Sequence, residues 1–482
     1  MRRIVSALAT LLCASAAMSL SGQTFTTVFS FDLTDGGLPF AGLVQGSDGN
    51  LYGTTQAGGT TLAGTTFKIT AGGALTKLHT FCSQSGCADG DGPQSNLLQG
   101  SNGTFYGTTY SGGANDKGTV FKMTAKGKVT TLHSFAGSPT DGANPYAGLI
   151  QATNGDFYGT TGAGGAGPGA GAGAVFKMTP NGTLTTIYSF CTQTGCPDGE
   201  APYAELVQAS NGNLYGTTAS GGAHFAGTIF EITPAGVLTT IYNFCSLSNC
   251  TDGIAPRSAL IQGTDGELYG TTVSSAAPLS AGTVFKVTLK GALTTLYTFC
   301  AQTGCSDGKS PYAGLVQGTD GNFYGMTYIG GDEVNTSEGG GTLFKITPSG
   351  VLTTLKSFCS DSNCTDGVNP LGGVMQATNG DFYGMTTGGG AKSEGTVFSL
   401  SESLGAFVET QPTSGKVGAA VKILGTDLTG ATSVSFNGTE AVFTVVSSSE
   451  ISTTVPSGAS TGKVKVVTPA GTLSSNISFR VP

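Results

Sequence analysis

The residues of this chain best suited to chemistry stand at one recurring position. Seven times the chain carries Asp-Gly, two variable residues and a proline, and the residue after the proline changes from copy to copy. Those seven residues are Phe40, Gln94, Tyr146, Tyr203, Arg257, Tyr312 and Leu371. Aromatic faces suit sugar rings, and the planar guanidinium of arginine suits a carboxylate or sulfate. We therefore treat Arg257, Tyr146, Tyr203 and Tyr312 as candidate ligand contacts, although each also fits an ordinary protein surface.

Five further candidates lie in the variable stretches of the same repeat. Tyr110 and Tyr328 directly follow the phrase Tyr-Gly-Thr-Thr or its variant Tyr-Gly-Met-Thr. Asp332, Glu333 and Glu338 lie in the longest variable stretch, residues 328–342. Binding groups lie more often on loops than on the scaffold that carries them, so these five residues are added to the candidate site.

The elements that must position these residues come from a unit that the chain repeats seven times. Its most regular phrase, DGNLYGTT at 48–55, recurs with tyrosines 52 to 59 residues apart, a period typical of solenoids and β-propellers. Each unit contains four strand-like runs, and an Asn-Gly or Asp-Gly hairpin turn joins the first two. In the second unit these runs are Asn96–Gly100, Thr104–Thr109, Thr119–Thr124 and Lys128–Phe135.

Four antiparallel strands in each of seven units predict an all-β, seven-bladed propeller over residues 23–403. The run TFTTVFSF at 24–31 matches the fourth strand of a unit, whereas the seventh unit stops after its third strand, near Leu400. We expect the N-terminal strand to complete the last blade and close the ring. Nearly all length variation falls between the second and third strands, which marks the face where those loops emerge as the variable one.

The histidines and the repeated acids fit structural roles better than catalytic or metal-binding ones. His79 and His133 occupy one register position of the repeat, and His224 stands alone in a loop. The seven Asp-Gly aspartates could suggest a calcium ring, but an Asp before Gly caps its own turn by accepting backbone N–H groups. A glutamine that recurs from Gln45 to Gln376 is expected to bond between strands near the channel. We predict no catalytic residues, no metal and no cofactor.

Ten cysteines form five pairs with four residues between partners, each pair before one of the Asp-Gly motifs. Both members of a pair are present or missing together, which predicts local disulfides in an oxidising compartment. The expected pairs are Cys82–Cys87, Cys191–Cys196, Cys245–Cys250, Cys300–Cys305 and Cys359–Cys364.

Composition and the first residues point to export. Arg2 and Arg3 precede an apolar stretch and small residues, which predicts a signal peptide over 1–22 and a secreted or cell-surface protein. We expect no membrane span after its removal, because no later segment is long and apolar enough. The net charge of −8 and the lack of a basic run argue against nucleic acid and anionic membranes as partners.

Residues 408–482 alternate short apolar runs with Gly, Ser and Pro breaks, which predicts a small β-sandwich. The segments 412–438 and 455–472 resemble the immunoglobulin-like IPT/TIG domain, which is commonly a spacer or interaction module in exported bacterial proteins. The phrases GLVQGSDGNLYGTT (42–55) and GTVFKMT (118–124) resemble the GloVer (Gloeo/Verruco) tandem repeat of "choice-of-anchor" exported proteins. That resemblance implies an extracellular life and brings no catalytic residues.

Three functions follow as hypotheses. The leading one is a non-catalytic exported protein whose propeller face binds an extracellular polysaccharide or a surface protein. The second is a polysaccharide-active or lyase-type enzyme, since the Asp-Gly-x-[Leu/Phe]-aromatic turn is similar to that of streptogramin lyase propellers. The chain departs from those lyases, because it has no Trp and only His224 lies outside the repeat register. The third is a purely structural surface protein.

Overall fold

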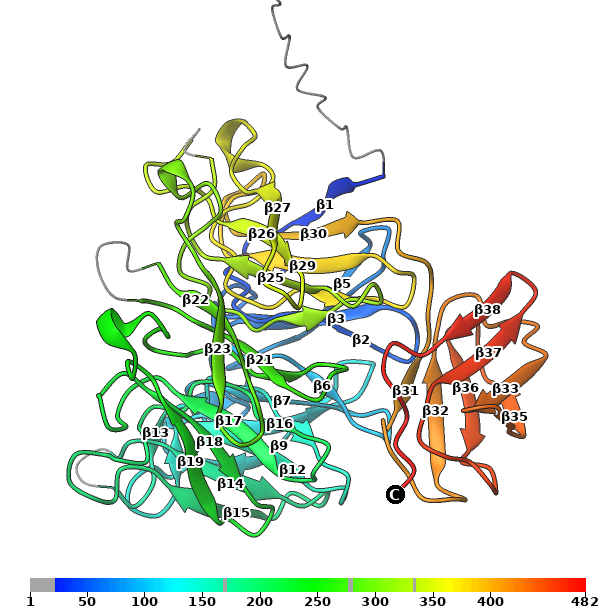
Figure 1. Ribbon diagram of the computed structural model, residues 1–482, viewed down its shortest axis with the longest axis horizontal. Helices are drawn as coiled ribbons and strands as arrows, with labels where there is room; N and C mark the ends of the chain where they lie inside the picture. Colours follow the sequence, from blue (N-terminus) through cyan, green and yellow to red (C-terminus); the bar gives the residue numbers. More distant parts are fainter. Residues whose placement is uncertain (1–21, 168–170, 276–280, 333–334) are drawn as a thin grey trace, which may run out of the picture.

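The structure, a computed structural model, describes residues 22–167, 171–275, 281–332 and 335–482. The expected signal peptide therefore lies outside the described residues, apart from Gly22. Nearly all regular structure is β-strand (Figure 1), and the short 3-10 turns among the described residues are Ser85–Cys87, Ser248–Cys250, Thr303–Cys305 and Ser362–Cys364. None of the helices in the described part of the chain is long and apolar enough to cross a membrane.

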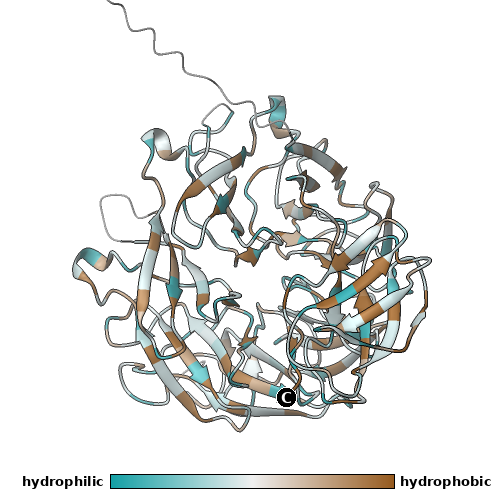
Figure 2. Cartoon of the chain, turned by 45° about the vertical axis from the view of Figure 1, so that its right-hand side comes forward, coloured by the Kyte–Doolittle hydropathy of each residue, from teal (hydrophilic) through white to brown (hydrophobic). Residues whose placement is uncertain are grey.

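Seven four-stranded antiparallel sheets form the blades of a propeller and surround a central axis (Figure 2). Within a blade the chain runs from the innermost strand to the outermost, and each neighbouring pair is antiparallel. The first three blades are β2 (Val44–Gln45), β3 (Leu51–Thr55), β4 (Thr65–Ile69), β5 (Leu75–Thr80); β6 (Leu98–Gln99), β7 (Phe105–Thr109), β8 (Thr119–Met123), β9 (Val129–Ser134); β11 (Ile150–Gln151), β12 (Phe157–Thr161), β14 (Ala174–Met178), β15 (Leu184–Ser189). The next three are β16 (Val207–Gln208), β17 (Leu214–Thr218), β18 (Thr228–Ile232), β19 (Leu238–Asn243); β20 (Ile261–Gln262), β21 (Leu268–Thr272), β22 (Thr283–Val287), β23 (Leu293–Thr298); β24 (Val316–Gln317), β25 (Phe323–Thr327), β26 (Thr342–Ile346), β27 (Leu352–Ser357). A small extra pair joins β10 (Gly142–Ala143) to β13 (Ala163–Gly164).

The seventh blade is closed by the start of the chain, as the sequence predicts. β1 (Thr24–Ser30) pairs antiparallel with β30 (Thr396–Ser401), which continues to β29 (Phe382–Thr386) and β28 (Met375–Gln376). The recurring glutamines close the ring a second time, because each side-chain carbonyl accepts a backbone N–H from the preceding blade at 2.8–3.0 Å. The last of these bonds joins the N–H of Thr378 in the seventh blade to Gln45 in the first.

The repeated tyrosine of the phrase 48–55 packs against the next blade, and the repeated glycine allows close packing within its own blade. The ring of Tyr52 packs on Phe105 of the next blade, with ring centroids 4.1 Å apart. Gly53 lies under Phe67 of the adjacent strand, and a Cβ added to it would lie 2.6 Å from that ring. Only glycine fits this close approach, so the phrase recurs because each blade needs the same packing.

The innermost strand of each blade is shorter than the sequence predicts. β6 spans Leu98–Gln99, whereas the expected strand covers Asn96–Gly100. Side chains replace the missing ladder, because Ser95 Oγ accepts the N–H of Thr108 at 3.2 Å and donates to its carbonyl at 3.3 Å. Thr54 of the previous blade also donates to the carbonyl of Ser95 at 3.1 Å. The segment before the strand is thus free to follow the channel wall without regular pairing.

The C-terminal residues form the predicted sandwich of two four-stranded sheets. Val421, Val434, Val466 and Phe479 belong to its buried core. One sheet has the order β31 (Glu409–Gln411), β32 (Ala420–Leu424), β36 (Glu450–Thr454), β35 (Phe443–Val445). The other has the order β34 (Thr439–Glu440), β33 (Ser433–Phe436), β37 (Val464–Thr468), β38 (Gly471–Ser474).

The sandwich docks on the turns that join the first and second strands of the first and seventh blades. Ser449 Oγ donates to the carbonyl of Ser47 at 2.8 Å, and the hydroxyls of Thr426 and Thr378 are 2.9 Å apart. In an antiparallel blade these turns and the loops between second and third strands emerge at opposite ends. The sandwich therefore leaves the variable face of the propeller open (Figure 1).

Candidate functional site

A pocket of about 410 Å³ opens at the mouth of the propeller channel, on the variable face. All seven residues that follow the repeat prolines contribute to its wall, because each stands where its blade's first segment enters the channel. The lining consists of these seven and one tyrosine from the longest loop: Phe40, Gln94, Tyr146, Tyr203, Arg257, Tyr312, Leu371 and Tyr328. We call this cavity the mouth pocket, and its size is typical of small-molecule sites.

Five tyrosine rings follow one another around part of this pocket. Tyr110 lies 4.8 Å from Tyr146 between ring centroids, and Tyr146 lies 4.7 Å from Tyr203. On the other side Tyr312 lies 5.5 Å from Tyr328 in an edge-to-face arrangement. These separations are within the range of favourable aromatic pairs, so the rings support one another. We call these five residues the aromatic arc.

Arg257 fills the break between the two halves of the aromatic arc. Its guanidinium carbon lies 5.2 Å from the centroid of Tyr203 and 5.9 Å from that of Tyr312. The residue is exposed, and among the described residues no carboxylate forms an ion pair with it. Cation–π contacts hold the group in place at both sides and leave its N–H donors to the pocket.

The hydroxyl of Tyr146 remains protonated in this setting. Burial raises the pKa of Tyr146 well above its usual value, and a hydrogen bond with Tyr110 raises it further. The side chain therefore offers a neutral hydroxyl donor beside an aromatic face, a combination that suits polyhydroxylated rings.

One layer of the ring behind the mouth pocket consists mostly of small residues. They stand two positions after the residue that follows each repeat proline: Gly42, Asn96, Gly148, Glu205, Ala259, Gly314 and Gly373. A Cβ added to Gly42 would lie 2.8 Å from the carbonyl oxygen of Gly373. One added to Gly314 would lie 3.0 Å from the carbonyl oxygen of Ala259. Neighbouring blades thus touch backbone to backbone in this layer, which we call the narrow layer.

Asn96 and Glu205 bridge the narrow layer from the second blade to the fourth. Asn96 Nδ2 donates to Glu205 Oε2 at 3.3 Å, and Asn96 Oδ1 accepts the N–H of Gly42 at 2.6 Å. Glu205 keeps partial solvent exposure toward the channel while protein surrounds it. Burial raises the pKa of Glu205 to about 7, and the bond from Asn96 opposes that shift only in part. The bridge is a polar contact within the narrow layer, and neither of its residues lines the mouth pocket.

The predictions from sequence did not include Asn96 or Glu205. The signal was present, because five copies carry Gly or Ala at this position while two carry Asn96 and Glu205. Only the closed ring shows that copies two and four meet across the channel.

Asp332 and Glu338 do not line the mouth pocket. Asp332 is exposed and lines a separate depression with Gln302 and Lys356 at the outer edge of the sixth blade. Glu338 is exposed, and Glu333 lies outside the described residues. Their role in binding stays a prediction, without support from proximity to the aromatic arc.

Two known families match this chain, one over the propeller and one over the sandwich. The Gloeobacter/Verrucomicrobia repeat matches residues 16–198, 83–277 and 172–398, which together cover most of the chain. The chain belongs to the Gloeobacter/Verrucomicrobia repeat family. The IPT/TIG domain matches residues 407–481, the sandwich. No curated protein matches the sequence at a significant level.

Solved structures match this Gloeobacter/Verrucomicrobia repeat protein at low sequence identity. A fungal alcohol oxidase of the AA5 family, solved in complex with copper, is 12% identical and has a TM-score of 0.53. That match covers 95% of this chain and 99% of the oxidase chain. A candidate 6-phosphogluconolactonase from Bacteroides uniformis is 17% identical over 67% of this chain and 84% of its own, with a TM-score of 0.43. At these identities the likeness shows the fold alone.

The repeated acids and histidines of the repeat have the structural roles that the sequence predicts. His79 Nε2 lies 3.0 Å from Asp89, and Tyr188 donates to Asp198 at 2.9 Å from the same register position. Asp89 also accepts the backbone N–H of Ser83 and that of Gln84, both at 3.2 Å, and so caps its loop. These side chains are engaged within the scaffold.

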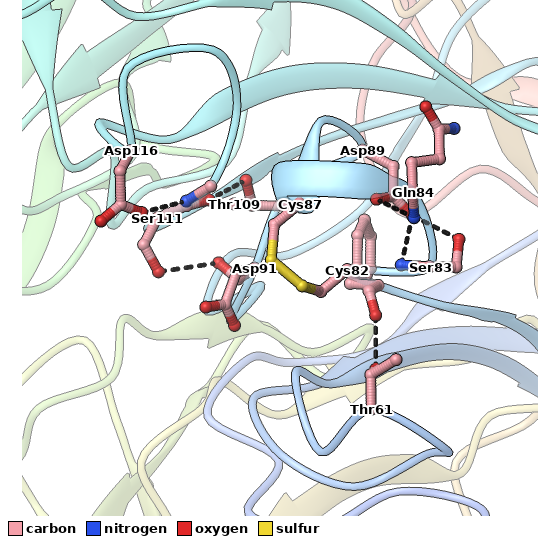
Figure 3. Close-up of a disulfide and its surroundings, with 12 residues drawn as sticks. Thr61, Cys82, Ser83, Gln84, Cys87, Asp89, Asp91, Thr109, Ser111 and Asp116 are labelled. Atoms are coloured by element: carbon pink, nitrogen blue, oxygen red, sulfur yellow. Dashed lines mark hydrogen bonds between the residues drawn. A yellow bond between two sulfur atoms is a disulfide. The ribbon is translucent and has the colours of Figure 1, made fainter.

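All five predicted disulfides are present, and Figure 3 shows the first of them, Cys82–Cys87. Among the described residues, the one group of three side chains with metal-ligand spacing is Cys191, Cys196 and Glu200. Both cysteines of that group are disulfide-bonded, so no thiolate is available there.

Proposed function

We propose that this protein is an exported, non-catalytic carbohydrate-binding protein whose mouth pocket holds an extracellular saccharide. The aromatic arc is the observation that carries the proposal. Four tyrosines from three blades line one cavity, Tyr110 of a further blade packs against one of them, and all five stand at positions where the repeat itself does not fix the residue. Variation at fixed scaffold positions is expected for a binding site and not for blade packing.

Stacking and hydroxyl recognition would act together in this pocket. A pyranose ring presents apolar C–H faces that pack on tyrosine rings, and its hydroxyls bond to tyrosine hydroxyls and the Arg257 donors. The pocket is pre-formed, because neighbouring rings and blade backbones already hold each side chain. Pre-formed sites lose less conformational entropy on binding.

The sandwich and the disulfides support an extracellular setting for this function. The IPT/TIG domain lies on the face opposite the mouth pocket, where it can space the propeller from a surface without covering the site. Five local disulfides suit an oxidising compartment. The signal peptide predicted at 1–22 would direct the protein to export.

The test is binding of the full mature chain to an array of defined glycans. Tyr203→Ala removes the central ring of the arc, and we expect at least tenfold weaker binding to the glycans that the wild type retains. Phe225→Ala is the matched control, because Phe225 is 71% exposed in a loop on the same face and does not line the pocket.

Each alternative function predicts a different outcome of the same measurement. Turnover of a bound glycan by the wild type would favour the enzyme. Equal binding by Tyr203→Ala and the wild type would refute the site. Binding of no glycan by any sample would favour a surface-protein ligand or a structural role.

A further inference from the structure

The guanidinium of Arg257 is an unpaired cation that faces the mouth pocket. It stands in the register position that carries tyrosine in both adjacent blades, and it is one of two arginines beyond Arg3. Among the described residues, none forms an ion pair or a side-chain hydrogen bond with it, while Tyr203 and Tyr312 flank it. A planar group with five donors, held between two rings, fits a carboxylate or sulfate that arrives from the pocket.

The narrow layer follows the pocket-lining residues along the first segment of each blade. Backbones of neighbouring blades touch there, and the Asn96–Glu205 bond joins the second blade to the fourth. This close packing favours a ligand that enters from the mouth. The net charge of −8 also disfavours a long polyanion laid across the surface, whereas Arg257 acts within the screening length of about 8–10 Å.

We propose that the mouth pocket takes the terminal sugar of an acidic polysaccharide, with its carboxylate or sulfate on Arg257 and its ring on the flanking tyrosines. This inference rests on the proposed carbohydrate function and adds the ligand's charge and its end-on orientation. On this proposal the site recognises a chain end and not a stretch within the chain.

Calorimetry with three short probes tests the charge. The probes are trigalacturonic acid, its fully methyl-esterified form, and a sulfated trisaccharide of the same length. We expect the methyl ester to bind at least tenfold more weakly than one of the two anionic probes, and the comparison of those two distinguishes carboxylate from sulfate. Arg257→Gln should reduce anionic binding 10- to 100-fold and weaken binding of the ester much less, because the amide keeps hydrogen-bond donors but carries no charge.

Two further variants sharpen the result. Arg257→Lys keeps the charge but loses the planar fork and the ring contacts, and it should recover only part of the affinity. Arg480→Gln is the matched control, because Arg480 is an exposed arginine of the sandwich and lies outside the pocket. It should bind like the wild type.

Chain length tests the end-on orientation. With oligogalacturonides of three and twelve residues, end-on binding predicts one protein per chain for both and similar affinities per chain. Several proteins per long chain would overturn the orientation.

The outcomes separate this inference from the proposed function. Equal binding of ester and acid would overturn the charge preference and leave carbohydrate binding intact. Binding of no saccharide would overturn both. A peptide with a free C-terminal carboxylate that binds through Arg257, while no saccharide does, would assign the pocket to a protein partner.

Discussion

Tyrosine has two separate roles in this protein, which differ in exposure and in partner. Tyr269 is 1% exposed and stacks 4.0 Å from Phe323 of the next blade. The tyrosine at the same repeat position is buried in every blade. Burial, followed by the hydrogen bond to Asp265, raises the pKa of Tyr269 well above its usual value. Tyr203, by contrast, is half-buried at the mouth and contacts Tyr146 and Arg257. Loss of the first kind should unfold a blade, and loss of the second should remove ligand contacts only.

Glu205 gives a pH-dependent prediction at the residue scale. Its folded pKa of about 7 is above the ordinary glutamate value of 4.5, so the neutral form is favoured in the native state. Its contribution to stability is therefore complete below pH 4.5 and is lost as the pH rises through about 7. Glu205→Gln should match the wild type near pH 4.5 and become more stable at pH 8 by about 1–3 kcal/mol.

Urea denaturation of both proteins from pH 4.5 to 8 measures this difference. Other groups titrate in the same range, so the quantity of interest is the gap between wild type and variant. A gap that does not change with pH would show that Glu205 is ionised at ordinary cost in the folded protein.

At the scale of elements, the loop that enters five of the seven blades is fixed by a disulfide and by its own acid. The carbonyl of Cys87 accepts the N–H of Gly90 at 2.8 Å and that of Gly113 at 2.9 Å. Gly113 belongs to the loop between the second and third strands, so the disulfide loop also positions its neighbour. Asp89 binds the other side of the loop (Figure 3). The variable face is therefore built from paired loops on a fixed base.

Removal of one disulfide should have a moderate effect. Cys82→Ala with Cys87→Ala should lower the free energy of unfolding by about 2 kcal/mol, because the bond closes a small ring in the unfolded chain. The fold should persist, since two other entry loops have no cysteines. Thermal unfolding and limited proteolysis check this, with a reduced wild type as the comparison. Loss of all cooperative unfolding would contradict the moderate effect.

At the scale of the whole molecule, ring closure depends on segments about 370 residues apart. β1 completes the blade formed by β28, β29 and β30. The glutamine bonds close the ring near the face that lies opposite the mouth pocket. The sandwich attaches beside this seam, at Ser47 of the first blade and Thr378 of the seventh. Closure and domain docking thus lie together, away from the mouth pocket.

A substitution at Phe25 tests how much β1 contributes to ring closure. The Phe25 ring lies 5.4 Å from Phe398 and 5.9 Å from Phe358 between centroids, so Phe25→Ala should lower the free energy of unfolding by about 2 kcal/mol. Phe225→Ala, which removes an exposed ring, should change it by less than about 0.5 kcal/mol. Equal stabilities of the two variants in urea denaturation would show that β1 contributes little to closure.

Much of the candidate site follows from the repeat once the register is known. The variable position after each proline identifies Tyr203 and Arg257, because residues in one register of a closed ring must lie at one level of the channel. The register does not place Asp332, whose loop lies at the outer edge of its blade. Glu205 departs from the Gly or Ala that five other copies carry in its register, but its meeting with Asn96 is visible only in the closed ring.

By itself, the sequence determined the seven blades, the N-terminal closing strand, the five disulfides and the sandwich. These features depend on local turn chemistry, on alternation and on a period that can be counted. Only the tertiary structure decided which rings touch, that Arg257 lies between Tyr203 and Tyr312, and that Asn96 reaches Glu205 across the channel. Those contacts join residues from different blades, and their distances depend on how tightly the ring closes, which no local pattern records.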